Sequence, residues 1–268
     1  SVGTRSFGND AEKVARLAAA AVRGFQREGV AACVKHFPGL GDTPIDTHMA
    51  MAAVDTPVDH LLKHDLVPYR ATIDAGVASV MITHVLYRTL DAEYPATLSP
   101  VVVNRLLREA LGYDGVVTTD CLEMRAVSDH YEPGESAVLS ALGGMDAILF
   151  SHTRAWQEAA YDGLLEAARS GRLPLELIDA ANRRMLALKQ AYAAPPGDLE
   201  IIRAREHLRV RRAAARAGTT LVQAGSALPL TDKASVGVVE FASILESGIV
   251  ESGGVSGFAR LLKTRLPA

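Results

Sequence analysis

ASVMITHV, at positions 78–85, is the stretch from which the fold class follows. It is a short, near-continuous apolar run rich in Val and Ile, which is typical of a parallel strand buried on both faces. Three more runs have this character: AACVKHF at 31–37, GVVTT at 115–119 and DAILF at 146–150. We expect these four runs to be parallel strands of one sheet.

Stretches with helical periodicity separate and follow these runs. They are 11–28, 61–75, 100–111, 135–143, 156–170 and 175–191. Alternation of buried strands with helices predicts an α/β fold with a parallel sheet. Four strands are too few for a closed (β/α)8 barrel, which takes about 250 residues.

The chain changes character near residue 193. The breaker AAPPGD at 193–198 is a candidate linker, and the arginine-rich stretch 203–216 is expected to be helical. We interpret that stretch as a solvated amphipathic helix. The alternative is a stripe that binds nucleic acid, but the stretch contains no aromatic residues. Two short strands are expected beyond it, at 219–223 and 235–241.

Composition excludes several classes of protein. The chain has 268 residues and a net charge of −3, whereas a nucleic-acid-binding protein usually shows a basic excess. Its 2 cysteines are too few for a disulfide framework or a four-cysteine zinc site. No apolar run approaches the roughly 18 residues of a membrane span. Residues 1–10 lack the apolar core of a signal peptide.

Polar residues follow each expected strand. Active sites of parallel α/β folds lie beyond the carboxyl ends of the strands, so these residues are expected to converge on one pocket. In chain order they are Lys35 and His36 with the loop that contains Asp46 and His48, then Thr83 and His84, then Asp120 and Cys121, and finally Ser151 and His152.

Asp120 has two interpretations. As the first residue after GVVTT it could cap the next helix, or it could act as a nucleophile or as the partner of a cationic transition state. Asp46 and His48 have two as well. The carboxylate could orient the imidazole and raise its basicity, forming a proton shuttle, or it could make a local turn beside an exposed histidine.

Two further hypotheses have little support in the spacing. His36, His48 and His84 with Asp46 could bind a metal, but their spacing matches no specific site. The glycines of GLGDTP at 39–44 could suggest a phosphate loop, but Pro44 stands where a third glycine would fall.

As one string, KHFPGLGDTPIDTH at 35–48 resembles the signature of the glycoside hydrolase family 3 β-N-acetylhexosaminidases of the NagZ type, which is close to KHFPGHGDTxxDSH. Further segments resemble the family in the same order: RSFGND at 5–10, VMITHVLY at 80–87, PATLSP at 95–100, LREALGYDGVVTTDCLEM at 107–124 and RRMLALK at 183–189. The resemblance covers roughly residues 5–190, and more loosely 219–230.

The resemblance implies a fold and a division into domains. Residues 1–192 would form part of a (β/α)8 TIM-type catalytic barrel whose N-terminal strands are missing. Residues 193–218 would be a linker and a helix, and residues 219–268 the beginning of a C-terminal α/β sandwich domain. We expect the chain to be a fragment of a longer protein, or to be completed by a partner.

The resemblance also implies roles for individual residues. Asp120, in TDCLEM, would be the catalytic nucleophile, His48 the general acid/base and Asp46 its dyad partner. Four residues would bind the sugar: Arg5, Lys35, His36 and, as a further candidate, His84. No cofactor and no metal is implied. Leu40, Thr47 and Cys121 depart from the family pattern without removing a catalytic group.

The expected function is hydrolysis of terminal β-linked GlcNAc by a retaining exo-β-N-acetylglucosaminidase that forms a glycosyl-enzyme intermediate. The substrate would be a small carbohydrate, from peptidoglycan fragments or chitooligosaccharides; no nucleic acid or membrane partner is expected. The alternatives are a family 3 β-glucosidase, which lacks the PGxGDTxxDxH loop, a GlcNAc phosphorylase, and a non-catalytic glycan-binding remnant.

Overall fold

The computed structural model describes residues 6–41, 43, 45–193, 197 and 201–219. Contacts divide the chain into two compact units, residues 1–194 and 195–268. Arg5, the expected strand at 235–241 and all but the first residue of that at 219–223 lie outside the described residues. The candidate site is built entirely from the first unit.

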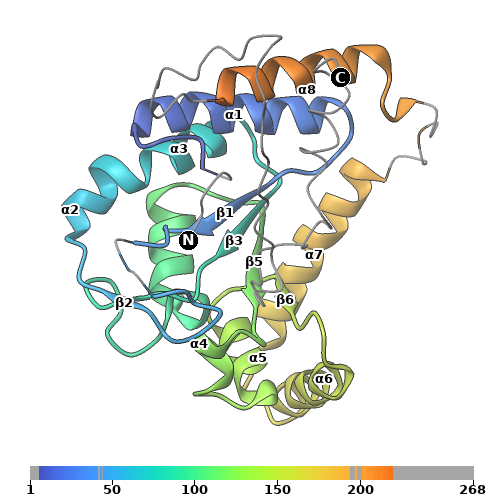
Figure 1. Cartoon of the computed structure of the whole chain (residues 1–268). Helices are drawn as coiled ribbons and strands as arrows, with labels where there is room; N and C mark the ends of the chain where they lie inside the picture. The colour runs from blue at the N-terminus through green and yellow to red at the C-terminus, as the bar shows by residue number, and fades with distance from the viewer. Residues whose placement is uncertain (1–5, 42, 44, 194–196, 198–200, 220–268) are drawn as a thin grey trace, which may run out of the picture. The chain divides into compact units, whose positions relative to one another are not determined.

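The four expected strands form one parallel sheet in the order β1-β3-β5-β6 (Figure 1). Their bounds are β1 Cys33–Phe37, β3 Ser79–Ile82, β5 Val116–Cys121 and β6 Ala147–Leu149. The register places Val80 beside Val117, and the β1–β3 pairing shifts between Lys35 and Phe37. All four carboxyl ends therefore lie at one edge of the sheet.

The expected helices are present, with two differences in form. The expected helix at 61–75 is divided into η2, Leu61–Asp65, and α3, Val67–Asp74. Pro68 lies in the first turn of α3, where it has no N–H with which to continue the preceding ladder. The expected helix at 100–111 is the π-helical η4, Val101–Ala110. The other helices are α1 Ala11–Arg27, α2 Val58–His60, η3 Ala96–Leu98, α4 Arg125–Ser128, α5 Pro133–Leu142, α6 Arg154–Arg169 and α7 Leu175–Tyr192.

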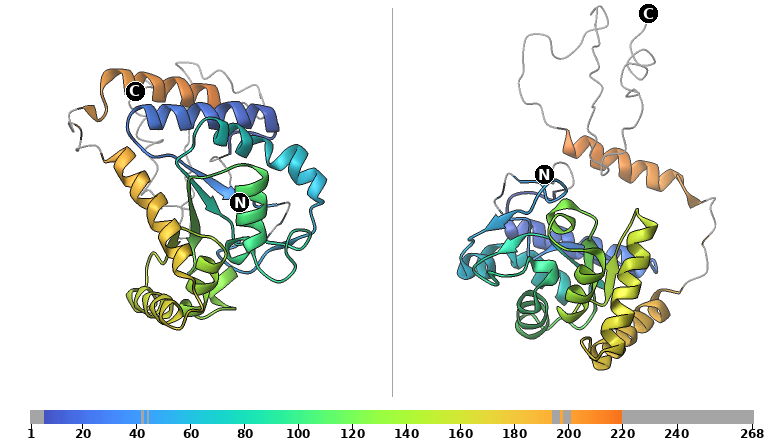
Figure 2. Two further views of the ribbon diagram at one scale, coloured as in Figure 1. Left: turned by 180° about the vertical axis from the view of Figure 1, so that it is seen from behind. Right: turned by 90° about the horizontal axis from the view of Figure 1, so that it is seen from below.

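The main core lies between one face of the sheet and the helices α1, α3 and η4. Val80 and Val117, neighbours in register, are fully buried there, with Val22 of α1 and Leu107 of η4 in the same cluster. Figure 2 shows α1 and α3 side by side from behind, in agreement with their direct packing. The near-continuous apolar strands thus form because their side chains are covered by helices.

A second, two-stranded parallel sheet was not predicted. It pairs β2, Ala53–Val54, with β4, Leu86–Tyr87. Strands of two residues carry no periodicity that a sequence could reveal. This small sheet joins the chain that follows β1 to the chain that follows β3.

The buried carboxylate of Asp146, the residue just before β6, binds arginine side chains from two helices. Asp146, with a side chain 1% exposed, accepts hydrogen bonds from Arg108 of η4 at 2.8 Å and from Arg184 of α7 at 2.9 Å. Its Oδ2 also accepts the amide of Val117 at 2.8 Å. Arg184 belongs to the segment RRMLALK, which resembles the family. Its ion pair with Asp146 lies at the start of β6, away from the carboxyl ends of the strands, so the segment has a structural role there.

In the second unit, helix α8 spans Arg205–Gly218 and confirms the expected helix. It presents the guanidinium groups of Arg205, Arg209, Arg212 and Arg216 together along an open groove. Across the described part of the chain, no helix has the length and apolarity that crossing a bilayer would require.

Candidate active site

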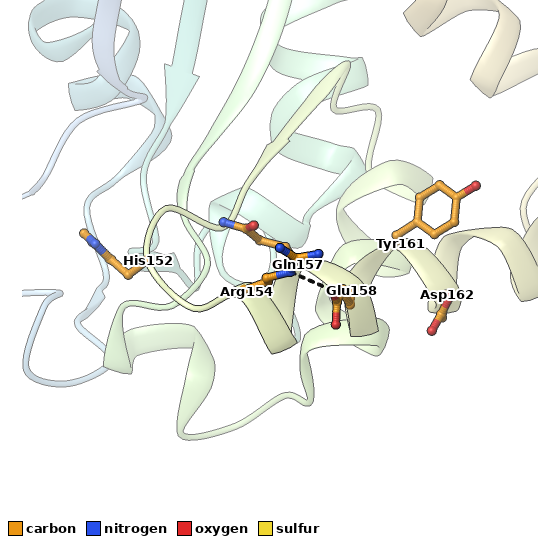
Figure 3. Close-up of a pocket in the computed structure, with 6 residues that line it drawn as sticks. All are labelled: His152, Arg154, Gln157, Glu158, Tyr161 and Asp162. Atoms are coloured by element: carbon orange, nitrogen blue, oxygen red, sulfur yellow. Dashed lines mark hydrogen bonds and ion pairs between the residues drawn. The ribbon is translucent and has the colours of Figure 1, made fainter.

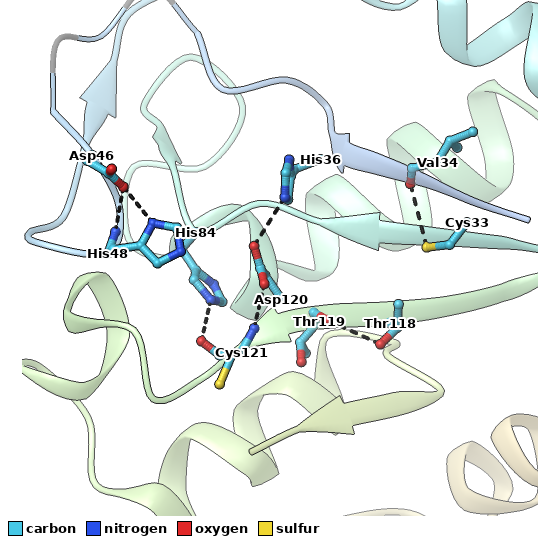
Figure 4. A network of polar contacts seen from close by, with 10 residues as sticks. All are labelled: Cys33, Val34, His36, Asp46, His48, His84, Thr118, Thr119, Asp120 and Cys121. Atoms are coloured by element: carbon cyan, nitrogen blue, oxygen red, sulfur yellow. Dashed lines mark hydrogen bonds and ion pairs between the residues drawn. The ribbon is translucent and has the colours of Figure 1, made fainter. Parts of the chain in front are cut away.

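Polar side chains gather at the carboxyl ends of β1, β3 and β5 (Figure 4). His36, Asp46, His48, His84 and Asp120 all lie in this network, although they are spread over 85 positions of the chain (120 − 36 = 84 steps). The structure thus brings together five of the seven residues singled out in the sequence. Lys35 is exposed on β1, and Arg5 lies outside the described residues.

Asp120 is the last residue but one of β5, and its carboxylate is half-buried. One oxygen, Oδ1, accepts the amide of Cys121 at 2.8 Å, and the other, Oδ2, lies 3.3 Å from Nε2 of His36. The next helix, α4, begins at Arg125 with Met124 as its N-cap, so Asp120 does not cap it. The capping interpretation is therefore wrong, and the carboxylate is left to face the network.

Asp46 and His48 combine both interpretations of their spacing. Oδ1 of Asp46 accepts the backbone amide of His48 at 3.0 Å, which is the local turn, and lies 2.6 Å from Nδ1 of the same residue's ring, which is the dyad. The hydrogen bond from the His48 amide and then the contact with its ring hold the pKa of the Asp46 carboxyl below its ordinary value. Nε2 of His48 is consequently the ring nitrogen that can reach a substrate.

The loop that carries this dyad is anchored where it runs into β2. The amide of Leu86 donates to the carbonyl of Ala52 at 2.8 Å, and the amide of Arg88 donates to that of Val54 at 3.1 Å. Gly41 has a φ of +68°, and a Cβ on it would lie 2.9 Å from Cγ1 of Val54. Only glycine fits this backbone position, which explains the second glycine of the string PGLGD.

His84 is buried next to the backbone of Cys121. Its ring is 1% exposed, and Nε2 lies 2.9 Å from the carbonyl oxygen of Cys121. Burial lowers the pKa of His84, with the nearby charges of Asp120 and His48 acting in opposite directions. The ring is thus bonded to the residue that follows Asp120 in the chain.

The sequence did not single out Glu123, which organises the loop after β6. Its carboxylate accepts the amides of His152 at 2.7 Å and Thr153 at 3.1 Å. Burial alone would raise the pKa of Glu123, but these hydrogen bonds lower it. The only available signal was its place three residues after Asp120 in TDCLEM.

His152 contacts Glu123 through its backbone amide, and its side chain is not part of the polar network of Figure 4. It lines an open pocket of about 530 Å³ beside α6, shown in Figure 3, whose lining residues are His152, Arg154, Gln157, Glu158, Tyr161 and Asp162. Arg154 and Glu158 form an ion pair of 2.9 Å in this lining.

The histidines of the metal hypothesis each have a different neighbour. His36 lies beside Asp120, His48 beside Asp46, and His84 beside a backbone carbonyl. Within the described ranges no three His, Cys, Asp or Glu side chains are grouped as metal ligands would be.

The sequence profile of the glycosyl hydrolase family 3 N-terminal domain matches residues 1–188. The chain belongs to this family. The four-stranded parallel sheet is accordingly part of a TIM-type barrel, which confirms the predicted fold class.

A solved structure and several curated proteins are similar to this chain. A glycoside hydrolase family 3 beta-N-acetylglucosaminidase from Paenibacillus sp. str. FPU-7 aligns with a TM-score of 0.71 and 50% identity over 74% of this chain and 38% of its own. Beta-hexosaminidase A of Pseudoalteromonas piscicida is 31% identical over 88% of this chain and 43% of its own length. Beta-hexosaminidase LpqI of Mycobacterium tuberculosis is 36% identical over 70% and 49%. The chain thus spans about half the length of these curated relatives.

Proposed function

We propose that the protein is a retaining exo-β-N-acetylglucosaminidase that hydrolyses terminal β-linked GlcNAc. The observation that carries the proposal is the pairing of a presented carboxylate, Asp120, with the His48–Asp46 dyad in one network at the strand ends. The similarity to proteins named beta-hexosaminidase and beta-N-acetylglucosaminidase supports the substrate class.

In the first step, Asp120 attacks the anomeric carbon while His48 donates a proton to the departing glycosidic oxygen. A covalent glycosyl-enzyme forms and the aglycone leaves as an alcohol. In the second step, His48 takes a proton from water, the hydroxide oxygen attacks the anomeric carbon, and the carboxylate of Asp120 is released. Two inversions give net retention.

The geometry suits each group to its task. The amide of Cys121 holds Oδ1 of Asp120, which fixes the direction of the carboxylate. Asp46 occupies Nδ1 of His48 at 2.6 Å and so leaves Nε2 for proton transfer.

Lys35 and His36, with Arg5, are proposed to bind the sugar hydroxyl groups. Nε2 of His36 lies 3.3 Å from Oδ2 of Asp120. Because Asp120 attacks the anomeric carbon in this proposal, His36 would lie beside that carbon. The substrates we expect are peptidoglycan fragments or chitooligosaccharides. We further assign residues 1–192 to the catalytic barrel, 193–218 to a linker and helix, and 219–268 to the beginning of a second α/β domain.

The test is chromophore release from an aryl β-GlcNAc by the 268-residue chain, beside the aryl β-glucoside and with Asp120→Ala as control. We expect GlcNAc-specific turnover that falls by several orders of magnitude in the control. Trapping with an activated 5-fluoro glycoside should add the mass of one sugar to the peptide that contains Asp120.

Other outcomes would identify other functions. Faster turnover of the glucoside would indicate a β-glucosidase. A phosphate-dependent yield of GlcNAc-1-phosphate would indicate a phosphorylase, for which a histidine acid/base repels the anion less than a carboxylate would. Folded protein that binds GlcNAc in calorimetry without turning over either glycoside would overturn the hydrolase and establish a glycan-binding protein.

A further inference from the structure

His84 is the most deeply buried ionisable group of the site, and the mechanism above assigns it no step. The residue is 1% exposed, two positions after the end of β3 and beside the carboxyl end of β5 (Figure 4). A ring so deeply covered cannot bind a sugar through its edges without displacing the structure above it. Its contacts instead connect it with the expected nucleophile.

Two hydrogen bonds join His84 to Asp120 through one residue. Nε2 of His84 donates to the carbonyl oxygen of Cys121 at 2.9 Å, and the amide of Cys121 donates to Oδ1 of Asp120 at 2.8 Å. The imidazole thereby holds the backbone of residue 121, and that backbone holds the carboxylate.

The second ring nitrogen shows which form of the imidazole is present. A carbonyl oxygen can only accept, so Nε2 must carry the proton. Nδ1 of His84 has no hydrogen-bond partner among the described residues and is fully covered. A proton there would leave a buried cation without a counter-charge in direct contact, which burial strongly disfavours. The ring is therefore a neutral donor with a single tautomer.

We propose that His84 is a positioning residue, which aims the Asp120 carboxylate by holding the peptide of Cys121. The proposal rests on the proposed function for its kinetic consequence only; the structural consequence can be measured without any substrate. Because His84 stays neutral, it holds Asp120 in the same way whether His48 is protonated or not.

Two amide variants separate this role from simple packing. The amide nitrogen of Gln lies where Nε2 of histidine lies, whereas that of Asn lies where Nδ1 lies. His84→Gln thus keeps a donor toward the carbonyl of Cys121, and His84→Asn loses it while remaining polar. Thermal unfolding of both variants shows whether each is folded before the comparison is made.

We expect kcat for the aryl β-GlcNAc to fall about 10- to 100-fold in His84→Asn, because a misdirected nucleophile lowers the rate of attack. KM should change by less than about threefold, and His84→Gln should retain kcat within about threefold of wild type. Equal loss in both variants, or a loss confined to KM, would overturn the positioning role.

The substrate-free measurement is the ¹H–¹⁵N resonance of the Cys121 amide. We expect it to move upfield in His84→Asn and to stay in place in His84→Gln. In the wild-type protein, ¹⁵N shifts of the ring should show a neutral Nε2–H tautomer from pH 5 to 8. An unmoved Cys121 amide, or a ring in the Nδ1–H form, contradicts the proposal even if the protein hydrolyses GlcNAc glycosides. If it hydrolyses none, the proposed function fails and these resonances still decide the role of His84.

Discussion

The carbonyl oxygen of Thr47 accepts a hydrogen bond from the amide of Ala126 at 3.2 Å. Thr47 lies between Asp46 and His48, and Ala126 lies in α4, which follows Asp120 in the chain. Thr47 is buried and Ala126 fully so. The loop of the expected acid/base is thus bonded to the segment of the expected nucleophile, so the two groups are positioned as parts of one structure.

The Asp46 carboxylate should contribute strongly to turnover. Asp46→Asn keeps the shape and the turn but removes the negative charge beside Nδ1 of His48. We expect kcat to fall about 10²- to 10⁴-fold, the range of general acid–base catalysis, with little change in thermal stability. Asp55→Asn, at an exposed ion pair with Arg88, is the matched control and should keep full activity. Unchanged turnover in Asp46→Asn would remove Asp46 from the proposed mechanism.

The same carboxylate should titrate at unusually low pH. The pKa of Asp46 is lowered, first by the amide of His48 and then by its ring. A carboxyl with a lowered pKa stabilises the folded state above its unfolded pKa of about 3.9, and this contribution is lost as the pH falls through the folded pKa. The ¹³C resonance of the Asp46 carboxyl should therefore show its protonation step only below about pH 3.9. A protonation step of this carboxyl above that value would contradict the contact.

Asp146 should be critical for stability and irrelevant to the chemistry. Asp146→Ala leaves Arg108 and Arg184 without their shared carboxylate in a site where that side chain is 1% exposed. We expect the free energy of unfolding to fall by about 3–5 kcal/mol, as when one partner of a buried ion pair is removed. Urea unfolding measures this. The exposed Asp114, replaced by Ala, should change it by less than about 0.5 kcal/mol.

Glu123 should hold the loop that follows β6. Glu123→Ala removes the acceptor of the His152 and Thr153 amides. Both amides should exchange with solvent at least about tenfold faster, the equivalent of roughly 1.4 kcal/mol, while the amides of β5 keep their protection. Glu109→Ala, on the exposed side of η4, is the control. If exchange at these two amides is unchanged, Glu123 does not order the loop.

Gly41 and Gly112 offer a matched pair of substitutions. Both have a φ of +68°, but only at Gly41 would a Cβ meet another group, 2.9 Å from Val54. Alanine should cost about 1–2 kcal/mol of stability at either position because of the left-handed backbone. Gly41→Ala should in addition lower kcat, since it displaces the loop of His48. Equal changes of kcat in the two variants would show that the contact with Val54 does not affect catalysis.

The sequence alone determined the local elements and which strand ends would meet. Near-continuous apolar runs at 31–37, 78–85, 115–119 and 146–150 can be satisfied only by a parallel sheet covered with helices, and that sheet formed. Since parallel strands end at one edge, the residues after them were expected to meet, and His36, Asp46, His48, His84 and Asp120 do.

Only the tertiary structure decided what each of these residues touches. Where the next helix starts decides whether Asp120 can cap it. The helix starts at Arg125, after the chain has turned through 122–124, so Asp120 is too far away to be its cap. His84 is covered and His48 is not, although both are histidines near strand ends. Burial, hydrogen-bond partners and the Thr47–Ala126 contact arise from residues far apart in the chain, so no local pattern encodes them.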